Sequence, residues 1–358
     1  MSATGETSGR AEGRRRAAVM TDVAKLAGVS HQTVSRVLNG SPQVRAETRE
    51  RVLLAMQELD YHPNSAARAL VTGRSRTLGV VSFDTTLFGP ASTLYAIERA
   101  AHDAGYFITI VSLEALDRES VLSAVARLRM QGVDGVLVIA PLEGSREALV
   151  ALPRDAPLVV VEAGPADTLP VVAVDQIAGA TLATQHLLDL GHPTVVHIAG
   201  RPDFLEAAQR IDGWRATLEA AGAEVPPVLV GDWSARSGYD LGRRLVREGG
   251  VSAIFVANDQ MALGVLRALH ESGLEIPRQV SVVGFDDIPE AQYYTPPLTT
   301  IRQDFGEIGR LSLRLMLEMM EPGGDVPRAP ALVMPELVLR SSTAPLNAGA
   351  GRAAAGGA

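Results

Sequence analysis

The chain has 358 residues, of which 46% are hydrophobic, 4% are aromatic and none is cysteine. A chain of this length is expected to form two or three domains with sizeable aliphatic cores. The lack of cysteine excludes disulfides, thiolate zinc sites and cysteine nucleophiles. No apolar run approaches the ~18 residues that span a bilayer, and no apolar segment follows the basic N-terminus. We therefore expect no contact with a membrane, no secretion signal and a cytoplasmic location.

The formal net charge of −8 is unevenly distributed along the chain. Residues 1–76 contain 12 Lys and Arg against 7 Asp and Glu, whereas the remainder contains 21 against 34. An acidic body with a basic N-terminal head predicts that only the head meets a polyanion. The triplet Arg14–Arg16 fits a solvated tail instead.

The head begins with two short amphipathic helices. The stretch DVAKLAGVSHQTVSRVLNG (22–40) predicts a helix over 22–27, a turn at Gly28 and a second helix capped by Ser30. The stretch RAETRERVLLAMQELD (45–60) predicts a third helix that closes a small core. This arrangement is typical of a helix-turn-helix, which places its second helix in the major groove of DNA. The alternative is a helical hairpin with a merely solvated face.

Polar side chains on the second helix are the candidate DNA contacts. Gln pairs with adenine and Arg with guanine, each pairing contributing ~1–3 kcal/mol of discrimination, whereas phosphate contacts position the protein without specifying sequence. We expect contacts from His31, Gln32, Thr33, Ser35, Arg36, Asn39 and Arg45.

From residue 77 the chain alternates short apolar runs with helical patterns. TLGVVSF, YFITIVS, VDGVLVIA and APLVVVE are typical of strands covered on both faces, and helical patterns lie between them over 92–105, 117–131 and 145–152. The same alternation repeats from VVAVD to VSVVGFDD. It predicts parallel sheets built from right-handed βαβ units, with too many strands for one ordinary sheet. The fold class is therefore α/β, with an all-α head and two doubly wound lobes.

Polar residues follow several of these predicted strands. Asn258 and Asp259 follow AIFVA, Asp286 and Asp287 follow VSVVGF, and Trp233 follows PVLVG. Ligands of open α/β sheets bind outside the carboxyl ends of the strands. Carboxylates, an amide and a flat aromatic face suit a sugar, so a sugar cleft is expected there. We expect Asp259 and Asp287 to act as helix caps or contacts between lobes, and Trp214 to lie in a core.

The order of these motifs resembles the LacI/GalR family of bacterial transcriptional regulators. The resemblance covers about residues 19–342 and rests on the head stretch together with YHPNSAARAL, GDWSARSG, VANDQMALG, SVVGFDD and YTPPLTTIRQDF. It implies a helix-turn-helix head, a hinge helix and a body of periplasmic-binding-protein type. The implied layout is a tail over 1–18, the head over 19–62, a hinge and linker over 63–76, the body over 77–342 and a tail over 343–358. Within the body, lobe one is expected over about 77–174 and 304–330, and lobe two over about 175–303 and 331–342.

The resemblance also implies residue roles. Asn64 and Leu70 match the family hinge, where the leucine wedges into the minor groove. Val19 stands where the family usually has a capping Thr. The implied ligand contacts are Leu87, Glu162, Arg210, Trp233, Asn258, Asp286, Gln303 and Phe305. Phe204 and Glu206 stand near small hydroxyl residues of one family member.

The function implied is a repressor that leaves a palindromic operator when a sugar, a galactoside as first candidate, binds between the lobes. A different sugar or a corepressor is the alternative, and a homodimer is expected because the C-terminal tail has no leucine heptads. A transport-linked sugar-binding protein is disfavoured by the head. An enzyme is disfavoured because GxGxxG, GxxxxGK and GxSxG are absent, and His186, His192 and His197 are irregularly spaced for a metal. No cofactor or metal is expected.

Overall fold

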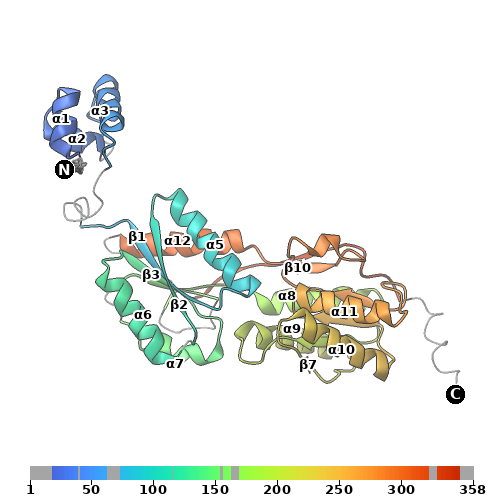
Figure 1. Ribbon diagram of the computed structural model, residues 1–358. Helices are drawn as coiled ribbons and strands as arrows, with labels where there is room; N and C mark the ends of the chain where they lie inside the picture. Colours follow the sequence, from blue (N-terminus) through green and yellow to red (C-terminus); the bar gives the residue numbers. More distant parts are fainter. Residues whose placement is uncertain are drawn as a thin grey trace, which may run out of the picture. The chain divides into compact units, whose positions relative to one another are not determined.

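The computed structural model describes residues 18–38, 41–62, 73–115, 117–153, 156–162, 169–321 and 329–346 (Figure 1). The chain divides into two compact units, a head over Met1–Ser75 and a body over Arg76–Ala358. The predicted hinge residues Asn64 and Leu70, the candidate contact Asn39 and the tail residues 1–17 and 347–358 lie outside the described residues.

The head contains three helices, as the sequence predicted: α1 (Met20–Ala27), α2 (His31–Leu38) and α3 (Ala46–Glu58). Gly28 ends α1 in the left-handed conformation, with φ of 65°, which glycine adopts without a steric penalty. Ser30 caps α2, because its Oγ accepts the Thr33 N–H at 3.2 Å. The core of the head consists of small aliphatic side chains, namely Val23, Ala24, Ala27, Val34, Val37, Val52 and Ala55.

The first sheet of the body has six parallel strands in the order β11-β5-β4-β3-β1-β2. They are β1 (Thr77–Phe83), β2 (Phe107–Leu113), β3 (Gly135–Ile139), β4 (Leu158–Val161), β5 (Val171–Val174) and β11 (Ala331–Val333). Helices α5 (Phe88–Asp103) and α12 (Phe305–Met320) cover one face, and α6 (Arg118–Met130) and α7 (Arg146–Val150) cover the other (Figure 1). Successive residues of β1 therefore enter different cores: Val80 packs with Ile97 and Met316, and Val81 packs with Val121.

The second sheet has four parallel strands in the order β7-β6-β8-β9. They are β6 (Val196–Ala199), β7 (Leu229–Val230), β8 (Ala253–Val256) and β9 (Ser281–Val283). The flanking helices are α8 (Gln176–Asp189), α9 (Leu205–Ala220), α10 (Ala235–Glu248) and α11 (Asp259–Glu271). Trp214 of α9 is fully buried, and its Nε1 donates to the Val195 carbonyl at 2.9 Å, so the prediction that it is a core residue is confirmed.

The chain crosses between the two lobes three times. The first crossing follows β5 at Asp175, as predicted, where the Asp175 side chain caps α8. The second follows β10 (Thr300–Arg302), which pairs antiparallel with β12 (Glu336–Val338). The third lies between β11 and β12, at Met334 and Pro335. Short 3-10 helices occur at η1 (Glu143–Ser145) and η2 (Ala291–Tyr293).

Two sequence-based boundaries were wrong. Residues 331–342 were assigned to lobe two, but Ala331–Val333 pairs in parallel with β5 of lobe one. The strand run is interrupted at Pro335, which has no N–H for a sheet ladder. Helix α5 begins at Phe88 rather than at residue 92. Pro90 lies in its first turn, where proline is tolerated, so the helix can start before this residue. Among the described residues, no helix has the length and apolar character needed to cross a membrane.

Candidate functional site

Three of the predicted DNA-contacting side chains are exposed on α2. His31, Gln32 and Arg36 of α2 are exposed, while Val34 and Val37 of the same helix enter the core. Helix α2 thus presents polar groups on the side opposite the core, which is what a recognition helix requires.

The remaining predicted contacts of the head flank this helix. Thr33 and Ser35 are half-buried, and the Thr33 Oγ1 lies 2.9 Å from the Ser30 Oγ at the start of α2. Arg45 is exposed at the residue preceding α3. Arg49, which the sequence analysis passed over, donates to the Ser41 carbonyl at 2.8 Å and so ties α3 to the loop after α2.

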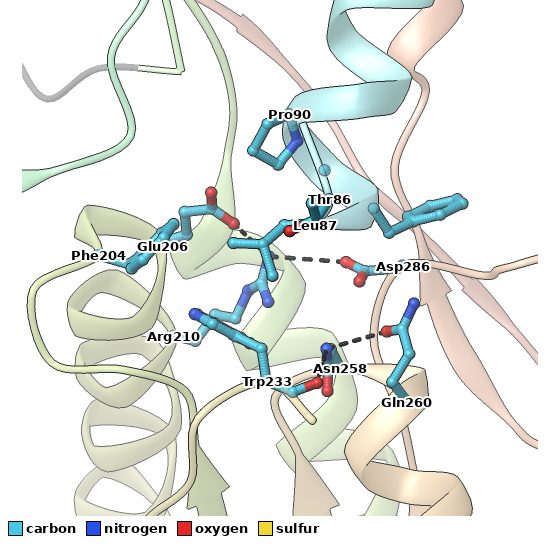
Figure 2. A pocket seen from close by; sticks show the side chains of 12 residues that line it. Thr86, Leu87, Pro90, Phe204, Glu206, Arg210, Trp233, Asn258, Gln260 and Asp286 are labelled. Carbon is cyan, nitrogen blue, oxygen red and sulfur yellow. Dashed lines mark hydrogen bonds and ion pairs between the residues drawn. The ribbon is translucent and has the colours of Figure 1, made fainter. Parts of the chain in front are cut away.

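The body contains a cavity between its two lobes, with about 500 Å³ of empty space that is partly open to solvent (Figure 2). Lobe one contributes the segment that leads into α5, and lobe two contributes side chains from α9 and from loops after its strands. The lining residues are Thr86, Leu87, Phe88, Gly89, Pro90, Phe204, Glu206, Arg210, Trp233, Asn258, Gln260 and Asp286.

A smaller cavity shares Gly89, Pro90 and Glu206 with the first. Its empty space of about 240 Å³ includes open solvent, and about 10 Å³ of it admits a water-sized group. Its other lining residues are Ile139, Pro141, Glu162, Gln303 and Phe305. Each of the eight predicted ligand residues therefore lines one of two adjoining cavities, five of them the larger and three the smaller.

Backbone geometry aims several of these residues into the cleft. Asn258 caps α11 through its Oδ1, which accepts the Met261 N–H at 2.9 Å, and its Nδ2 donates to the Trp233 carbonyl. Glu162, Trp233 and Asp286 have φ of 55°, 74° and 108°, a region that side chains other than glycine rarely adopt. Such conformations cluster at binding sites, where the surrounding fold enforces them.

Arg210 is the centre of the polar network. It is 1% exposed, and it donates through Nη2 to Glu206 at 3.1 Å and through Nε to Gln176 at 2.9 Å (Figure 2 shows the Glu206 pair). Its Nη2 lies 3.8 Å from Asp286 Oδ1, and its Nη1 donates to the Ala257 carbonyl. These four contacts hold the guanidinium in place.

Gln176 and Gln303 close this network into a ring. Gln176 Nε2 donates to Gln303 Oε1 at 2.9 Å, and Gln303 Nε2 donates to Asp286 Oδ1 at 2.7 Å. Gln176 was missed by the sequence analysis, although it follows β5 at the same edge of the sheet as the residues that were found.

Burial raises the pKa of all three carboxyl groups near Arg210. The pKa of Asp286 rises to about 7, because desolvation exceeds the opposing effect of Arg210. Desolvation also raises the pKa of Glu206. The pKa of Glu162 rises to about 8, chiefly through desolvation and then through the charge of Glu206. The cleft therefore strongly favours neutral carboxyls or a compensating positive charge.

Aromatic side chains form the floor of the larger cavity. The rings of Phe204 and Trp233 meet edge to face with centroids 5.7 Å apart. The indole fits only because residue 200 is glycine, since a Cβ there would lie 2.1 Å from the Trp233 ring. Trp233 Nε1 is buried without a hydrogen-bond partner among the described residues, so it is a donor available to a ligand.

Other polar residues singled out from the sequence serve the fold. Asp259 accepts the Thr300 hydroxyl at 2.6 Å and the Ile288 N–H at 2.9 Å, and Asp287 accepts hydrogen bonds from Arg302 and Arg340. These contacts tie the loops after β8 and β9 to β10 and to the segment after β12. Asp259 and Asp287 thus support the cleft without lining it.

Both the head and the body are similar to known regulatory proteins. Residues 19–64 match the family of bacterial regulatory proteins, lacI family, and residues 184–343 match the periplasmic binding protein-like domain. The chain is 36% identical to the lactose operon repressor of Escherichia coli strain K12 over 324 residues, covering 90% of this chain and 89% of that one. It is 34% identical to the HTH-type transcriptional repressor PurR of Haemophilus influenzae, covering 91% and 98%. A crystal structure of the Lac repressor dimer bound to operator and the anti-inducer ONPF superposes with a TM-score of 0.81 at 36% identity, covering 92% of this chain and all of that one.

Proposed function

The chain belongs to the lacI family of bacterial regulatory proteins, and we propose that it represses transcription from a palindromic operator until a sugar binds between the lobes of its body. The observation that carries this proposal is the coexistence of two sites in one chain. One is the exposed polar start of α2, and the other is the cavity between the lobes with Arg210 at its centre.

At the operator, His31, Gln32 and Arg36 would read base edges, while Thr33, Ser35 and Arg45 would contact phosphates or the groove walls. The similar Lac repressor is a dimer on its operator. A homodimer of this chain would likewise place two copies of α2 in successive major grooves of a two-fold symmetric site. Asn39, Asn64 and the wedge role of Leu70 belong to the same proposal.

In the cleft, Asn258, Asp286 and Arg210 would bind sugar hydroxyls, and Trp233 and Phe305 would pack against the apolar face of the ring. The similarity to a lactose operon repressor makes a galactoside the first candidate. The side chains of Phe204 and Glu206 line the cavity and take up space in it. A sugar other than a galactoside is therefore the alternative.

Coupling between the two sites follows from linkage. The lobes can adopt one relative angle that suits operator binding and another that does not. A sugar can lower operator affinity only to the extent that it binds the second arrangement more tightly than the first. The same factor must appear in reverse, so operator binding weakens sugar binding. We infer that the protein acts in the cytoplasm as a regulator without catalytic activity, in agreement with the repressors that it resembles.

The test is a tryptophan fluorescence titration with galactosides, glucosides, xylosides and maltose-type sugars. Only Trp214 and Trp233 contribute, and Trp214 lies in a core, so a saturable change should come from Trp233. Trp233→Phe should abolish it. The same sugar should release an operator fragment from the wild type, and Asp286→Ala should bind that fragment but ignore the sugar.

Two outcomes would contradict the proposal. Silence across the whole panel, together with operator binding that no sugar alters, would remove sugar induction. A normal response of Asp286→Ala to sugar would remove Asp286 from the site.

A further inference from the structure

The smaller cavity has an unusual charge balance. Its lining includes two carboxyl side chains, Glu162 and Glu206, and no basic side chain. The rest of the lining is a Gln303 amide, Gly89 and the apolar residues Pro90, Ile139, Pro141 and Phe305. Two carboxylates in such surroundings repel each other across a poorly screened space.

The nearest cation does not balance both groups. Arg210 lines only the larger cavity, where it pairs with Glu206 at 3.1 Å and lies 3.8 Å from Asp286. Its other donors are taken by Gln176 and the Ala257 carbonyl. Three carboxyl groups thus share one guanidinium, and Glu162 has no direct pair among the described residues.

Glu162 also carries an unused acceptor. Its Oε1 is buried and has no hydrogen-bond partner among the described residues, although the carboxylate is near the backbone N–H of Val174. An unsatisfied buried acceptor destabilises a fold unless a ligand or water donates to it. Gln303 does not serve this purpose, because its amide donates to Asp286 and accepts from Gln176.

We propose that the smaller cavity binds a protonated amino group of the effector between Glu162 and Glu206, so that the effector is an amino sugar, a hexosamine, rather than a neutral sugar. This inference rests on the sugar-binding function proposed above and narrows its ligand class. An ammonium group has three donors, which suit the free oxygen of Glu162 and a lone pair of Glu206. Its charge allows both carboxyl groups to be ionised at the same time, which a neutral hydroxyl cannot do.

The inference has a proton signature. The pKa of Glu162 in the empty cleft is about 8, with Glu206, Arg210 and Asp286 as the charged groups around it. Glu162 is therefore mostly protonated at pH 7, and an arriving ammonium would displace that proton. Binding should release up to one proton, and affinity should rise with pH by up to about tenfold per unit while the amine stays charged.

The experiment is calorimetric titration of the full-length protein with D-galactosamine, D-galactose and N-acetyl-D-galactosamine, and with the three corresponding gluco sugars. At pH 7, the free amine should bind at least tenfold more tightly than the neutral parent in one series, and acetylation should remove the advantage. Titrations in two buffers with different heats of ionisation should show that a proton is released when an amino sugar binds and not when a neutral sugar binds. Affinity for the amine should rise between pH 6.0 and 7.5.

The variant Glu162→Gln keeps the size of the side chain and removes its charge. It should lose the preference for the amine and the pH dependence of binding. Glu219→Gln, on the exposed side of the same helix as Glu206 and Arg210, is the matched control and should behave as the wild type.

The outcomes separate the two proposals. If galactose and glucose bind as tightly as their amines in the wild type and release no proton, the amine inference is wrong and sugar induction stands. This comparison needs no variant, so a folding defect in Glu162→Gln would not obscure it. If none of these six hexoses binds, the amine inference is wrong as well, and the wider panel of galactosides, glucosides, xylosides and maltose-type sugars then decides whether sugar induction stands.

Discussion

In the head, His31, Gln32 and Arg36 are exposed on a single helix. In the body, by contrast, Arg210 and Asp286 are buried, Glu162 is half-buried, and the three come from distant segments. The first set can meet DNA without any change in the core beneath it. Arg210 and Asp286 lie in the interior of the body, so the ligand site and the stability of the body depend on the same contacts. Substitutions at the two sites should therefore differ in kind: those in the cleft affect stability and response together, and those on α2 affect recognition alone.

The largest expected effect comes from the small core of the head. Val52→Asp places a carboxylate at a fully buried position among six other small aliphatic residues. Burial of an unpaired charge costs several kcal/mol, which a core this small cannot offset. Operator binding, measured by fluorescence anisotropy, should be lost, while the sugar titration of Trp233 should persist because the body has its own cores.

The control for this variant is Leu53→Asp on the same helix. Leu53 is 51% exposed, so the same carboxylate there should leave the melting of the head nearly unchanged. Loss of the sugar titration in Val52→Asp would show that the two units do not fold independently.

The second effect concerns Arg210. Arg210→Met keeps an unbranched side chain but leaves Glu206 and Asp286 without their shared cation. Removal of one partner from a buried ion pair destabilises a protein by about 3–5 kcal/mol. Urea unfolding of the body should show a loss of this order, and the response to sugar should disappear with it.

Arg215→Met, at an exposed position of the same helix, is the matched control and should change stability by less than about 0.5 kcal/mol. A body of Arg210→Met as stable as the wild type would mean that the carboxyl groups are neutral in the empty cleft.

The third effect is confined to recognition. Gln32 is exposed on α2, so Gln32→Ala should leave thermal stability unchanged. It should weaken binding to the cognate operator by about 1–3 kcal/mol and relax preference at one base pair of each half-site, while nonspecific binding stays the same. Competition with operators substituted one base pair at a time measures this, with Gln57→Ala on α3 as the control. An equal loss on every sequence would make Gln32 a phosphate contact.

The same contrast explains what the sequence could and could not predict. The head depends on local signals, so the glycine turn, the Ser30 cap and the exposed face of α2 were all predicted correctly. In the body, the strands and the polar residues after them were predictable, because buried parallel strands have continuous apolar runs and their carboxyl ends share one edge of the sheet.

What local sequence did not reveal depends on contacts over long distances. The pairing of β11 with β5 joins residues about 160 positions apart, and the run ALVMPELVLR does not show where it changes lobes. The bridge from Arg210 through Gln176 to Gln303 spans three segments. The positive φ of Glu162 and Asp286 is enforced by packing rather than by residue type. The sequence drew attention to Glu206, but only the structure shows that it lines both the larger and the smaller cavity.

The smallest expected effect comes from adding a side-chain cap to the start of α1. Val19 occupies the N-cap of α1 with φ of −116° and ψ of 165°, and its side chain caps nothing. Asp22 already provides half of a capping box, because its Oδ2 accepts the Val19 N–H at 3.0 Å. In Val19→Thr, the new hydroxyl oxygen could accept a hydrogen bond from the Asp22 N–H and so complete the capping box. In the wild type, this N–H donates to the Val19 carbonyl at 2.8 Å.

Because that N–H already has a partner, the gain should lie at the low end for a cap, about 0.5–1 kcal/mol. Thermal unfolding of the head measures it, with Val19→Ala as the variant that changes the side chain without adding an oxygen. The sugar response should not change in either variant, since the head and the body have separate cores. A gain in Val19→Ala equal to that in Val19→Thr would show that loss of the exposed valine, and not the cap, stabilises α1.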